Sequence, residues 1–316
     1  MNVATRDPAA LARAELVLRA ACGERLRTSF PLAPLTTFRI GGPAALFLEP
    51  ESEADLRAAG QAVRETGIPF VVLGKGSNVI VSDTGFPGLV LRLGKSYRWA
   101  ARDGSMITAG GSMPLPRLAG VALAHSLAGA EFGVAIPATL GGGVRMNAGA
   151  HGHSLSEVVR QVDVFLLGAG EARTIPADEA GFVYRNSALP ADGVVVAAAL
   201  GLRPGDPGEI RAALDEARDW RRRTQPLAEP NCGSVFKNPP GDHAARMVES
   251  LGLKGTAVGG AQVSEKHANF IVARPGALAA DVVALIRTVQ ERVADGYGVR
   301  LEPEVHLVGS FDVTPD

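Results

Sequence analysis

The chain has 316 residues, a length that usually divides into two or three domains. Its 32 Lys and Arg residues nearly balance 33 Asp and Glu residues. The resulting formal charge of −1 argues against a nucleic-acid-binding protein, which usually carries a clustered basic excess. Hydrophobic residues make up 46% of the chain and charged residues 21%, which excludes a disordered protein and predicts a globular one.

The compartment is predicted from the cysteines and from the apolar segments. Cys22 and Cys232 are too few for a disulfide framework or a four-ligand metal site, and free thiols favour a reducing compartment. The N-terminal segment has charges throughout, unlike a secretory signal, and no apolar run is long enough to span a bilayer. We therefore expect a cytoplasmic protein without membrane insertion. The sequence does not determine the oligomeric state, for which a monomer is the default.

In chain order, the first predicted element is an amphipathic helix over 8–22, interpreted as part of a peripheral extension that covers residues 1–28. Short β-rich pieces follow over 29–50 and a helix over 51–67, which ends at a glycine. The apolar run PFVVLG (69–74) predicts a buried strand that leads directly into the loop GKGSN. A β-α-β unit therefore closes by about residue 74.

The remaining chain has two regions with different predicted secondary structure. Apolar strands separated by turn residues surround one predicted helix at 114–129, and PGDPG (204–208) reads as a linker. The last region mixes strands with helices predicted at 208–222, 243–255 and 277–298. The predicted class is α+β, with domains at 29–78, 79–206 and 207–316 after the extension.

Several common catalytic and nucleotide-binding motifs are absent from the sequence. The loop after residue 74 fails the P-loop pattern, and neither glycine-rich loop completes the dinucleotide fingerprint G-x-G-x-x-G. The sequence contains no G-x-S-x-G and no H-E-x-x-H. His151 and His153 form an H-x-H pair, for which a turn is favoured over a metal site because no other ligands lie close by in sequence. No metal site is predicted.

Two glycine-rich segments are candidates for ligand contact. The backbone N–H groups of GKGSN (74–78) could converge on a phosphate, with an ordinary turn as the equal alternative. The segment GVAIPATLGGGVRMNAGAHG (133–152) consists mostly of small residues, which suits main chain laid against a flat ring such as isoalloxazine or adenine. A flexible loop is the alternative, although its interspersed apolar residues argue against one.

Three further sequence segments indicate a functional site only because they occur together. They are YRNS (184–187), GSVFKNP (233–239) and a glutamate, Glu304, in the last predicted strand EVHLVG. Taken singly, the arginine is most simply a surface cation, the serine a turn former and the glutamate a solvated side chain.

The ordered set LGKGSNVIVSD, AIPATLGGGVRMNAGA, FVYRNSAL, GSVFKNP, GAQVSEKHANFIV and LEPEVHLVG resembles the UDP-N-acetylenolpyruvoylglucosamine reductase family of bacterial peptidoglycan synthesis, over about residues 30–310. The resemblance implies an FAD-binding fold of the vanillyl-alcohol-oxidase type in two subdomains, followed by a substrate-binding domain. A fold of this type is consistent with the missing dinucleotide fingerprint.

The resemblance also implies a reaction and three catalytic residues. NADPH reduces FAD, and flavin N5 then passes a hydride to C3 of the enolpyruvyl ether of UDP-N-acetylglucosamine, which yields UDP-N-acetylmuramate. Arg185 would stabilise the enediolate, and Glu304 would assist as a hydrogen-bond donor in its protonated form. Ser234 would deliver the proton to C2.

Binding residues carry over from the same resemblance. Expected substrate contacts are Tyr184, Asn238, His267 and Asn269. Expected FAD contacts are Gly74, Lys75, Gly76, Ser77, Asn78, Ile136, Pro137, Gly141, Gly142, Gly143, Asn147, Ala148 and Gly149.

The sequence departs from the family's better-known type in three places. Only 49 positions separate Arg185 from Ser234, which resembles a shorter type without the loop whose tyrosine covers the substrate. His306 stands where an arginine is common, so a diphosphate contact there is left open. A lysine expected before the serine motif is missing, and the sequence alone does not select its substitute from residues 221–223, all arginines.

Two alternatives to this function stay open. One is an FAD oxidoreductase of the same fold that acts on a different alcohol or sugar. The other is a nucleotide-binding regulator without catalytic activity. The joint presence of Arg185, Ser234 and Glu304 disfavours both.

Overall fold

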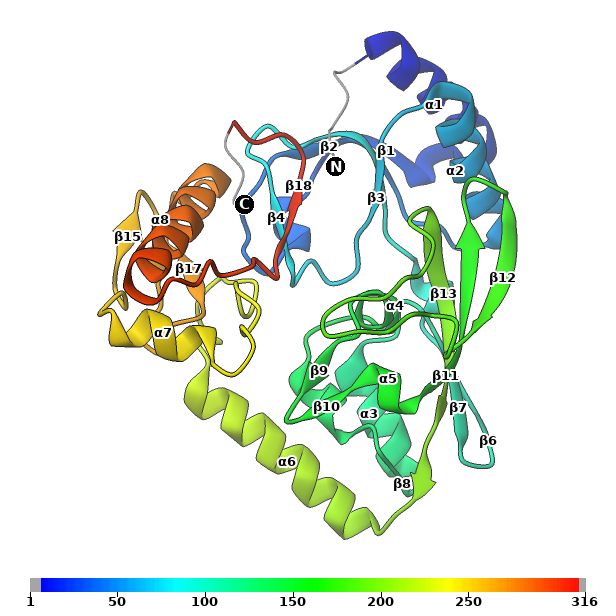
Figure 1. Ribbon diagram of the computed structural model, residues 1–316. Coiled ribbons are helices and arrows are strands. Elements are labelled where there is room, and N and C mark those ends of the chain that lie inside the picture. The colour runs from blue at the N-terminus through cyan, green and yellow to red at the C-terminus, as the bar shows by residue number, and fades with distance from the viewer. Residues whose placement is uncertain (1–6, 313–316) are drawn as a thin grey trace.

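The computed structural model describes residues 7–312, which form three units of sheet and helix (Figure 1). Residues 1–6 of the expected extension and residues 313–316 of the expected substrate-binding domain lie outside the described residues.

The first unit contains α1 (Pro8–Cys22), η1 (Gly23–Arg25), β1 (Leu26–Pro31), η2 (Ala33–Leu35), β2 (Pro43–Leu48), α2 (Glu53–Thr66), β3 (Phe70–Val72) and β5 (Phe86–Leu91). The strand order is β1-β2-β5-β3, and β2 and β3 both run parallel to β5. The apolar run of β5 thus completes the first sheet. The domain boundary expected after residue 78 therefore does not coincide with the change of sheet, which falls between β5 and residue 100.

Helix α1 packs on α2 and is part of this unit instead of an isolated extension. Its buried residues are spaced four apart and form one narrow apolar stripe, Ala10, Ala14, Leu18 and Cys22. This stripe shares a hydrophobic core with Leu56 of α2 and with Phe165 from the second unit.

Asp55 is the polar link between α1 and α2. Its carboxylate accepts hydrogen bonds from Arg25 Nη2 (2.8 Å) and from the Ser52 backbone N–H (3.1 Å), while Ser52 Oγ caps the Asp55 N–H. Burial raises the pKa of this carboxyl, but the bonds from Arg25 and from the backbone outweigh burial and lower its pKa overall. Burial and Asp55 together raise the pKa of the neighbouring Cys22 thiol to about 11, so this thiol stays protonated at neutral pH.

Replacement of Asp55 should therefore weaken the first unit. We expect Asp55→Asn to lower the free energy of unfolding by about 1–3 kcal/mol, because charge-assisted bonds to a carboxylate that is only 3% exposed are lost. The pKa of this carboxyl is lower in the folded than in the unfolded chain, so its contribution is full above the unfolded value of 3.8 and is lost as the pH falls below it. Urea titrations at several pH values should show a shallower acid limb for the variant. An unchanged limb would contradict this account.

The second unit is a five-stranded antiparallel sheet with helices on one face. It contains β6 (Ala100–Asp103), β7 (Met106–Gly110), α3 (Leu115–Ala124), η4 (Glu131–Ala135), α4 (Leu140–Arg145), α5 (Leu155–Val158), β11 (Val159–Leu166), β12 (Glu171–Pro176) and β13 (Gly193–Gly201). The strand order is β12-β11-β13-β7-β6. Two short ladders pair β8 (Leu127–Ala128) with β14 (Arg203–Pro204) and β9 (Gly149–Ala150) with β10 (His153–Ser154), and η3 (Lys95–Tyr97) precedes the sheet.

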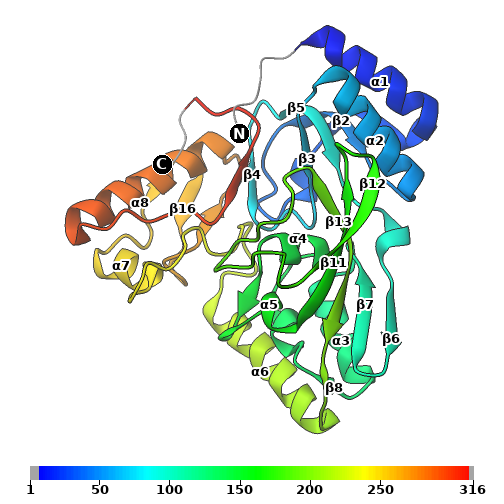
Figure 2. The same cartoon turned by 45° about the vertical axis from the view of Figure 1, so that its right-hand side comes forward.

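The third unit begins with a long helix, α6 (Pro207–Thr224), which runs from the second unit to the third in Figures 1 and 2. Ile210 and Leu214 of this helix share a hydrophobic cluster with Ala119 of α3. The remaining elements are α7 (Ala244–Ser250), β15 (Ala257–Val258), β16 (Ala261–Val263), β17 (Ile271–Ala273), α8 (Ala279–Tyr297) and β18 (His306–Val308).

The third unit is joined to the first by hydrogen bonds from backbone and side chains. Strand β18 pairs in parallel with β4 (Val79–Val81), which follows the GKGSN turn. Asp83, just after β4, accepts hydrogen bonds from the first N–H groups of α8, those of Ala279 (2.8 Å) and Ala280 (3.0 Å). Since a carboxylate is favourable at a helix N-terminus, these contacts hold α8 on the first unit and bring residues 302–306 beside the GKGSN turn.

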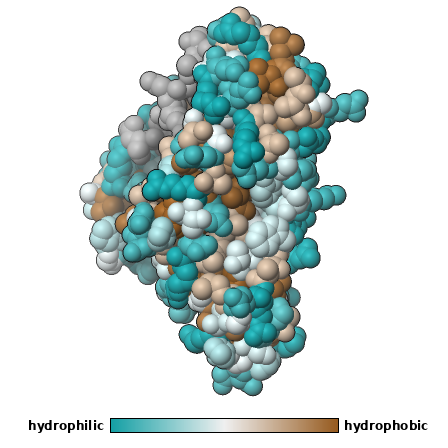
Figure 3. Space-filling view, turned by 90° about the vertical axis from the view of Figure 1, so that its right-hand side faces the viewer, coloured by the Kyte–Doolittle hydropathy of each residue, from teal (hydrophilic) through white to brown (hydrophobic). Residues whose placement is uncertain are grey.

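Within residues 7–312 no helix has both the length and the apolar character to cross a bilayer. The face in Figure 3 mixes hydrophilic with hydrophobic residues and carries no continuous apolar band.

Candidate active site

Arg185 lies at the tip of a tight turn. Val183 and Asn186 exchange two backbone hydrogen bonds, of 3.1 and 3.2 Å, which place Tyr184 and Arg185 between them. Arg185 has a φ of 56°, in the left-handed region that residues other than glycine, asparagine and aspartate rarely adopt. Its guanidinium carbon lies 5.0 Å from the centroid of the Tyr184 ring. A strained arginine in this position requires firm support from its surroundings.

The Arg185 side chain reaches Glu304 from the other end of the chain. Arg185 Nε lies 3.0 Å from Glu304 Oε1, and Nη2 donates to the Gly149 carbonyl at 3.1 Å. Both side chains are largely buried, 22% and 17% exposed. Burial raises the pKa of the Glu304 carboxyl, while the charges of Arg185 and Lys237 partly oppose this rise. Burial thus favours the neutral form of Glu304, whereas the two neighbouring cations favour its ionised form.

Ser234 enters the same site through the backbone. The Glu304 N–H donates to the carbonyl of Val235, the next residue after Ser234, at 2.7 Å, and Phe236 forms a bridge with Pro303. Ser234 is half-buried, and its hydroxyl has no hydrogen-bond partner within residues 7–312. The structure thus brings the segment that carries Ser234 beside Glu304 through the backbone, and Glu304 in turn pairs with Arg185.

Asn269 and His267 support the serine segment. Asn269 is 4% exposed, and its amide donates to the Phe236 carbonyl (2.8 Å) and accepts from the Phe236 N–H (2.9 Å). His267 Nδ1 accepts from the Asn269 N–H at 3.2 Å, and its ring packs edge-on against Phe270 at 4.7 Å. Burial, followed by the charge of Lys254, lowers the pKa of His267. The Asn269 amide is therefore bonded to protein groups, and contact of Asn269 and His267 with the substrate stays a prediction.

The other two expected substrate residues are more exposed. Asn238 accepts a hydrogen bond from Ala244 N–H at 3.1 Å, at the start of α7, and its side chain faces solvent. Tyr184 is 52% exposed. Their contact with a nucleotide sugar stays a prediction.

The GKGSN turn carries a row of unpaired donors. The N–H groups of residues 74–77 have no acceptor within residues 7–312. Gly76 has a φ of 63°, and a Cβ added there would overlap the backbone of Leu35. Asn78 Nδ2 donates to the Glu304 carbonyl at 3.0 Å, and the Asn78 carbonyl accepts from His306 N–H at 3.1 Å. Convergent free N–H groups fit a diphosphate such as that of FAD, and Asn78 ties this turn to Glu304.

The glycine-rich segment folds into α4 and the two short strands β9 and β10. Gly143 is buried, and a Cβ on it would lie 2.9 Å from Leu115 and Leu155, so core packing alone requires glycine there. Gly142 lies on the open side of the helix, where a Cβ would meet only Thr139 Oγ1, at 3.4 Å. Asn147 is 5% exposed and bonded entirely to protein groups.

The other expected FAD contacts in this segment vary in burial. Ile136 packs against the core of the second unit, and Pro137 lines a cavity described next. Gly141, Ala148 and Gly149 are partly exposed. Their contact with FAD stays a prediction.

A cavity of about 390 Å³ lies between the GKGSN turn and the start of the third unit. Its charged lining residues are Arg39, Lys75, Arg92, Arg221 and Glu229, so cations predominate. Ser77, Pro137 and Gly233 also border it, which places it beside Ser234. Sequence reasoning missed Arg39 and Arg92. The only signal for Arg39 was its place before the Gly41-Gly42 break.

The structure selects one arginine from RRR (221–223). Arg221 lines the cavity, and its Nε donates to Gln225 Oε1 at 2.9 Å, while burial lowers its pKa. Arg222 and Arg223 are exposed, and Arg222 pairs with Asp219 on the surface of α6. The burial of this cation in a cavity wall makes Arg221 the candidate for an anion contact.

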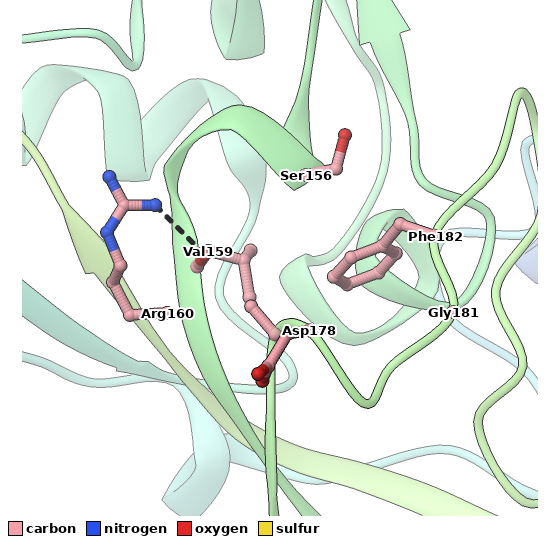
Figure 4. A pocket seen from close by; sticks show the side chains of 7 residues that line it. Ser156, Val159, Arg160, Asp178, Gly181 and Phe182 are labelled. Atoms are coloured by element: carbon pink, nitrogen blue, oxygen red, sulfur yellow. Dashed lines mark hydrogen bonds between the residues drawn. The ribbon is translucent and has the colours of Figure 1, made fainter.

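His306 lies beside the GKGSN turn, and a second cavity lies in the second unit. His306 Nε2 lies 3.2 Å from Met146 Sδ, and desolvation and Lys237 lower the pKa of this histidine. Within residues 7–312 no three His, Cys, Asp or Glu side chains are grouped to hold a metal. An open cavity of about 540 Å³ is shown in Figure 4, where Arg160 and Phe182 lie on opposite sides with Asp178 below them.

Comparison with known proteins is consistent with this geometry. A family model described as an FAD binding domain matches residues 44–175. A second, for the C-terminal domain of UDP-N-acetylenolpyruvoylglucosamine reductase, matches residues 225–308. The fold and these matches define an FAD-dependent oxidoreductase of mixed α and β structure, which confirms the fold class predicted from the sequence.

Similar proteins define the family. UDP-N-acetylenolpyruvoylglucosamine reductase of Anaeromyxobacter sp. (strain Fw109-5) is 47% identical over 299 residues, which cover 95% of this chain and 93% of that protein. The crystal structure of the Thermus caldophilus reductase superimposes with a TM-score of 0.78 at 36% identity, over 90% of this chain and 99% of that one. The chain belongs to the UDP-N-acetylenolpyruvoylglucosamine reductase family, as the sequence motifs predicted. A glucose dehydrogenase, Phl p 4, shares the fold alone, with 15% identity and a TM-score of 0.50.

The GKGSN turn permits a direct test of the diphosphate cradle. We expect Gly76→Ala to lose most of its bound FAD, because a methyl group at a φ of 63° would push the turn away from Leu35 and misalign its N–H groups. The matched control is Gly152→Ala, where φ is 80° but the added methyl group meets open space. The ratio of flavin to protein absorbance after purification measures the difference. Equal FAD content in the two variants would contradict the cradle.

Proposed function

We propose that the protein reduces the enolpyruvyl ether of UDP-N-acetylglucosamine to UDP-N-acetylmuramate in the cytoplasm, with NADPH as the reductant. The observation that carries the proposal is the pairing of Arg185 with Glu304, whose N–H bonds to the residue next to Ser234. The cationic cavity reaches this segment at Gly233. When bound, FAD supplies the hydride that it has received from NADPH. The steps below concern the protein's own side chains.

Arg185 and Glu304 would stabilise the charge that develops on the substrate. Addition of hydride to the terminal carbon of the enolpyruvyl group places negative charge on the adjacent carboxylate oxygens, as an enediolate. The Nε and Nη2 atoms of Arg185 are engaged with protein acceptors, and Nη1 has none within residues 7–312, so it is available to the substrate carboxylate. A substrate carboxylate would raise the pKa of Glu304 further, because like charges repel, and would convert it into a hydrogen-bond donor.

Ser234 would complete the reaction by proton donation. Ser234 lies on the segment that Asn269 and Glu304 hold through hydrogen bonds to its backbone. The Ser234 hydroxyl forms no hydrogen bond with the part of the protein that the structure describes. A serine hydroxyl is a weak acid, but an enediolate is basic enough to take its proton. An alcohol oxidase of the same fold would instead need a general base at this position, whereas a serine hydroxyl is suited to donate a proton.

The proton-donor role predicts a separation of the two half-reactions. We expect Ser234→Ala to keep flavin reduction by NADPH at the wild-type rate and to slow flavin reoxidation by the enolpyruvyl nucleotide by about 10²–10⁴-fold. Anaerobic stopped-flow absorbance follows both steps. Ser234→Cys, which retains a proton donor, should recover part of the rate. Reoxidation of Ser234→Ala at the wild-type rate would make Ser234 a turn residue only.

The cationic cavity predicts a second, different effect. We propose that Arg221 binds the diphosphate of the nucleotide substrate, so Arg221→Gln should raise KM for this substrate roughly tenfold and change kcat little, as expected for the loss of one charge-assisted bond. Arg222→Gln is the matched control, because Arg222 is exposed on the same helix and pairs with Asp219. Steady-state kinetics of the two variants decide the matter. Equal KM values would remove Arg221 from the binding site.

A further inference from the structure

Asn147 was expected from the sequence to contact FAD, yet the structure commits its side chain to the backbone. Nδ2 donates to the Val183 carbonyl at 3.0 Å, and Oδ1 accepts from the Ser156 N–H at 2.9 Å. The residue is 5% exposed and has a φ of 42°, a conformation that asparagine and aspartate tolerate better than other side chains. Both polar groups of this buried amide are bonded, so its side chain connects the backbone at Val183 with that at Ser156.

The Val183 carbonyl is the group that closes the turn carrying Arg185. It accepts one hydrogen bond from the Asn186 N–H at 3.2 Å and a second from Asn147 Nδ2. On the far side of the same turn, Ser187 Oγ donates to the Arg145 carbonyl at 2.8 Å. The turn is therefore held at both ends by residues 145–147, which are the last residue of the glycine-rich helix α4 and the two residues after it.

This support has a consequence for the catalytic arginine. Arg185 holds a left-handed φ of 56°, and such a conformation persists only where the surroundings determine it. Without the Asn147 amide, the Val183 carbonyl would lose a buried partner and the turn could relax. The Arg185 guanidinium, 3.0 Å from Glu304, would then lose its alignment with both the carboxylate and the substrate.

We propose that Asn147 is a positioning residue that sets the direction of Arg185 through the Val183 carbonyl, and that it does not bind the cofactor directly. The inference rests on the proposed function, in which Arg185 stabilises the enediolate. It predicts a defect in the half-reaction that uses the nucleotide substrate and none in the half-reaction with NADPH.

The sharpest test is Asn147→Asp, which preserves shape, tolerance of the left-handed φ and the acceptor for Ser156 N–H. Its ionised carboxylate offers an oxygen lone pair where the Val183 carbonyl needs a donor. We expect wild-type FAD content, flavin reduction by NADPH within twofold of wild type, and reoxidation by the enolpyruvyl nucleotide slowed by roughly 10–100-fold at pH 8, the cost of one misplaced charge-stabilising group.

The same variant should show a diagnostic pH profile. Burial raises the pKa of a carboxyl group, and the protonated form can donate to the Val183 carbonyl as the amide does. The reoxidation rate of Asn147→Asp relative to wild type should therefore recover as the pH falls from about 8 to about 5.5. A side chain that only contributed stability would give no such recovery.

Two further measurements cover a variant that folds poorly or loses FAD. Asn147→Ser avoids a buried charge and should show the same slow reoxidation without the recovery at low pH. Hydrogen–deuterium exchange of the peptide 181–188, measured without substrate, should be faster in both variants because the Asn186 N–H bond to Val183 is weakened. Thr174→Val, which removes an exposed side-chain bond to Asp163 in the same unit, should change neither readout.

The outcomes separate this inference from the proposed function. If wild-type reduced enzyme is not reoxidised by the enolpyruvyl nucleotide, the proposed function is wrong. If wild type is reoxidised and both Asn147 variants match it, Asn147 does not position Arg185. Loss of FAD with normal reoxidation in the loaded fraction would assign Asn147 to cofactor binding and overturn the inference.

Discussion

Glu304 is the residue at which the three units of the protein meet. Its N–H bonds to Val235 of the third unit, its carbonyl accepts from Asn78 of the first, and its carboxylate faces Arg185 of the second. A short segment before β18 thus fixes the relative positions of a glycine-rich turn, a serine segment and a strained arginine. Residues more than 200 positions apart can form one site because the last strand returns to pair with β4.

Opposing electrostatic influences act on the Glu304 carboxylate at this meeting point. Burial favours a neutral Glu304, whereas Arg185 and Lys237 favour its ionised form. Because these influences oppose each other, a ligand that brings a carboxylate can change the balance at small cost. On a solvent-exposed surface the same pair would be a salt bridge of little energetic value. Because the pair is partly buried, the protonation of Glu304 depends more strongly on nearby charges.

The motifs predicted candidate site residues, and the structure shows which of their side chains are bonded to distant parts of the chain. Arg185, Ser234 and Glu304 were predictable because each lies in a short, distinctive segment, and the structure brings those segments together. The hydrogen bonds of the Asn269 and Asn147 side chains to distant backbone groups were not predictable, since no local sequence pattern indicates such bonds. The place of β5 in the first sheet was missed for a related reason. An apolar run predicts a strand, but its partners depend on the rest of the fold.

Overall charge and local charge lead to different conclusions about ligands. The net charge of −1 lowers the expectation of phosphodiester binding, which needs an extended basic surface. A nucleotide diphosphate needs only a few donors in one cavity, and here Arg39, Lys75, Arg92 and Arg221 surround about 390 Å³ of space with one acidic neighbour. The field in such a partly enclosed space depends on the nearest charges, because distant ones are screened by solvent and salt. A nearly neutral chain can therefore place several cations around one cavity, and the fold shows which of its arginines line it.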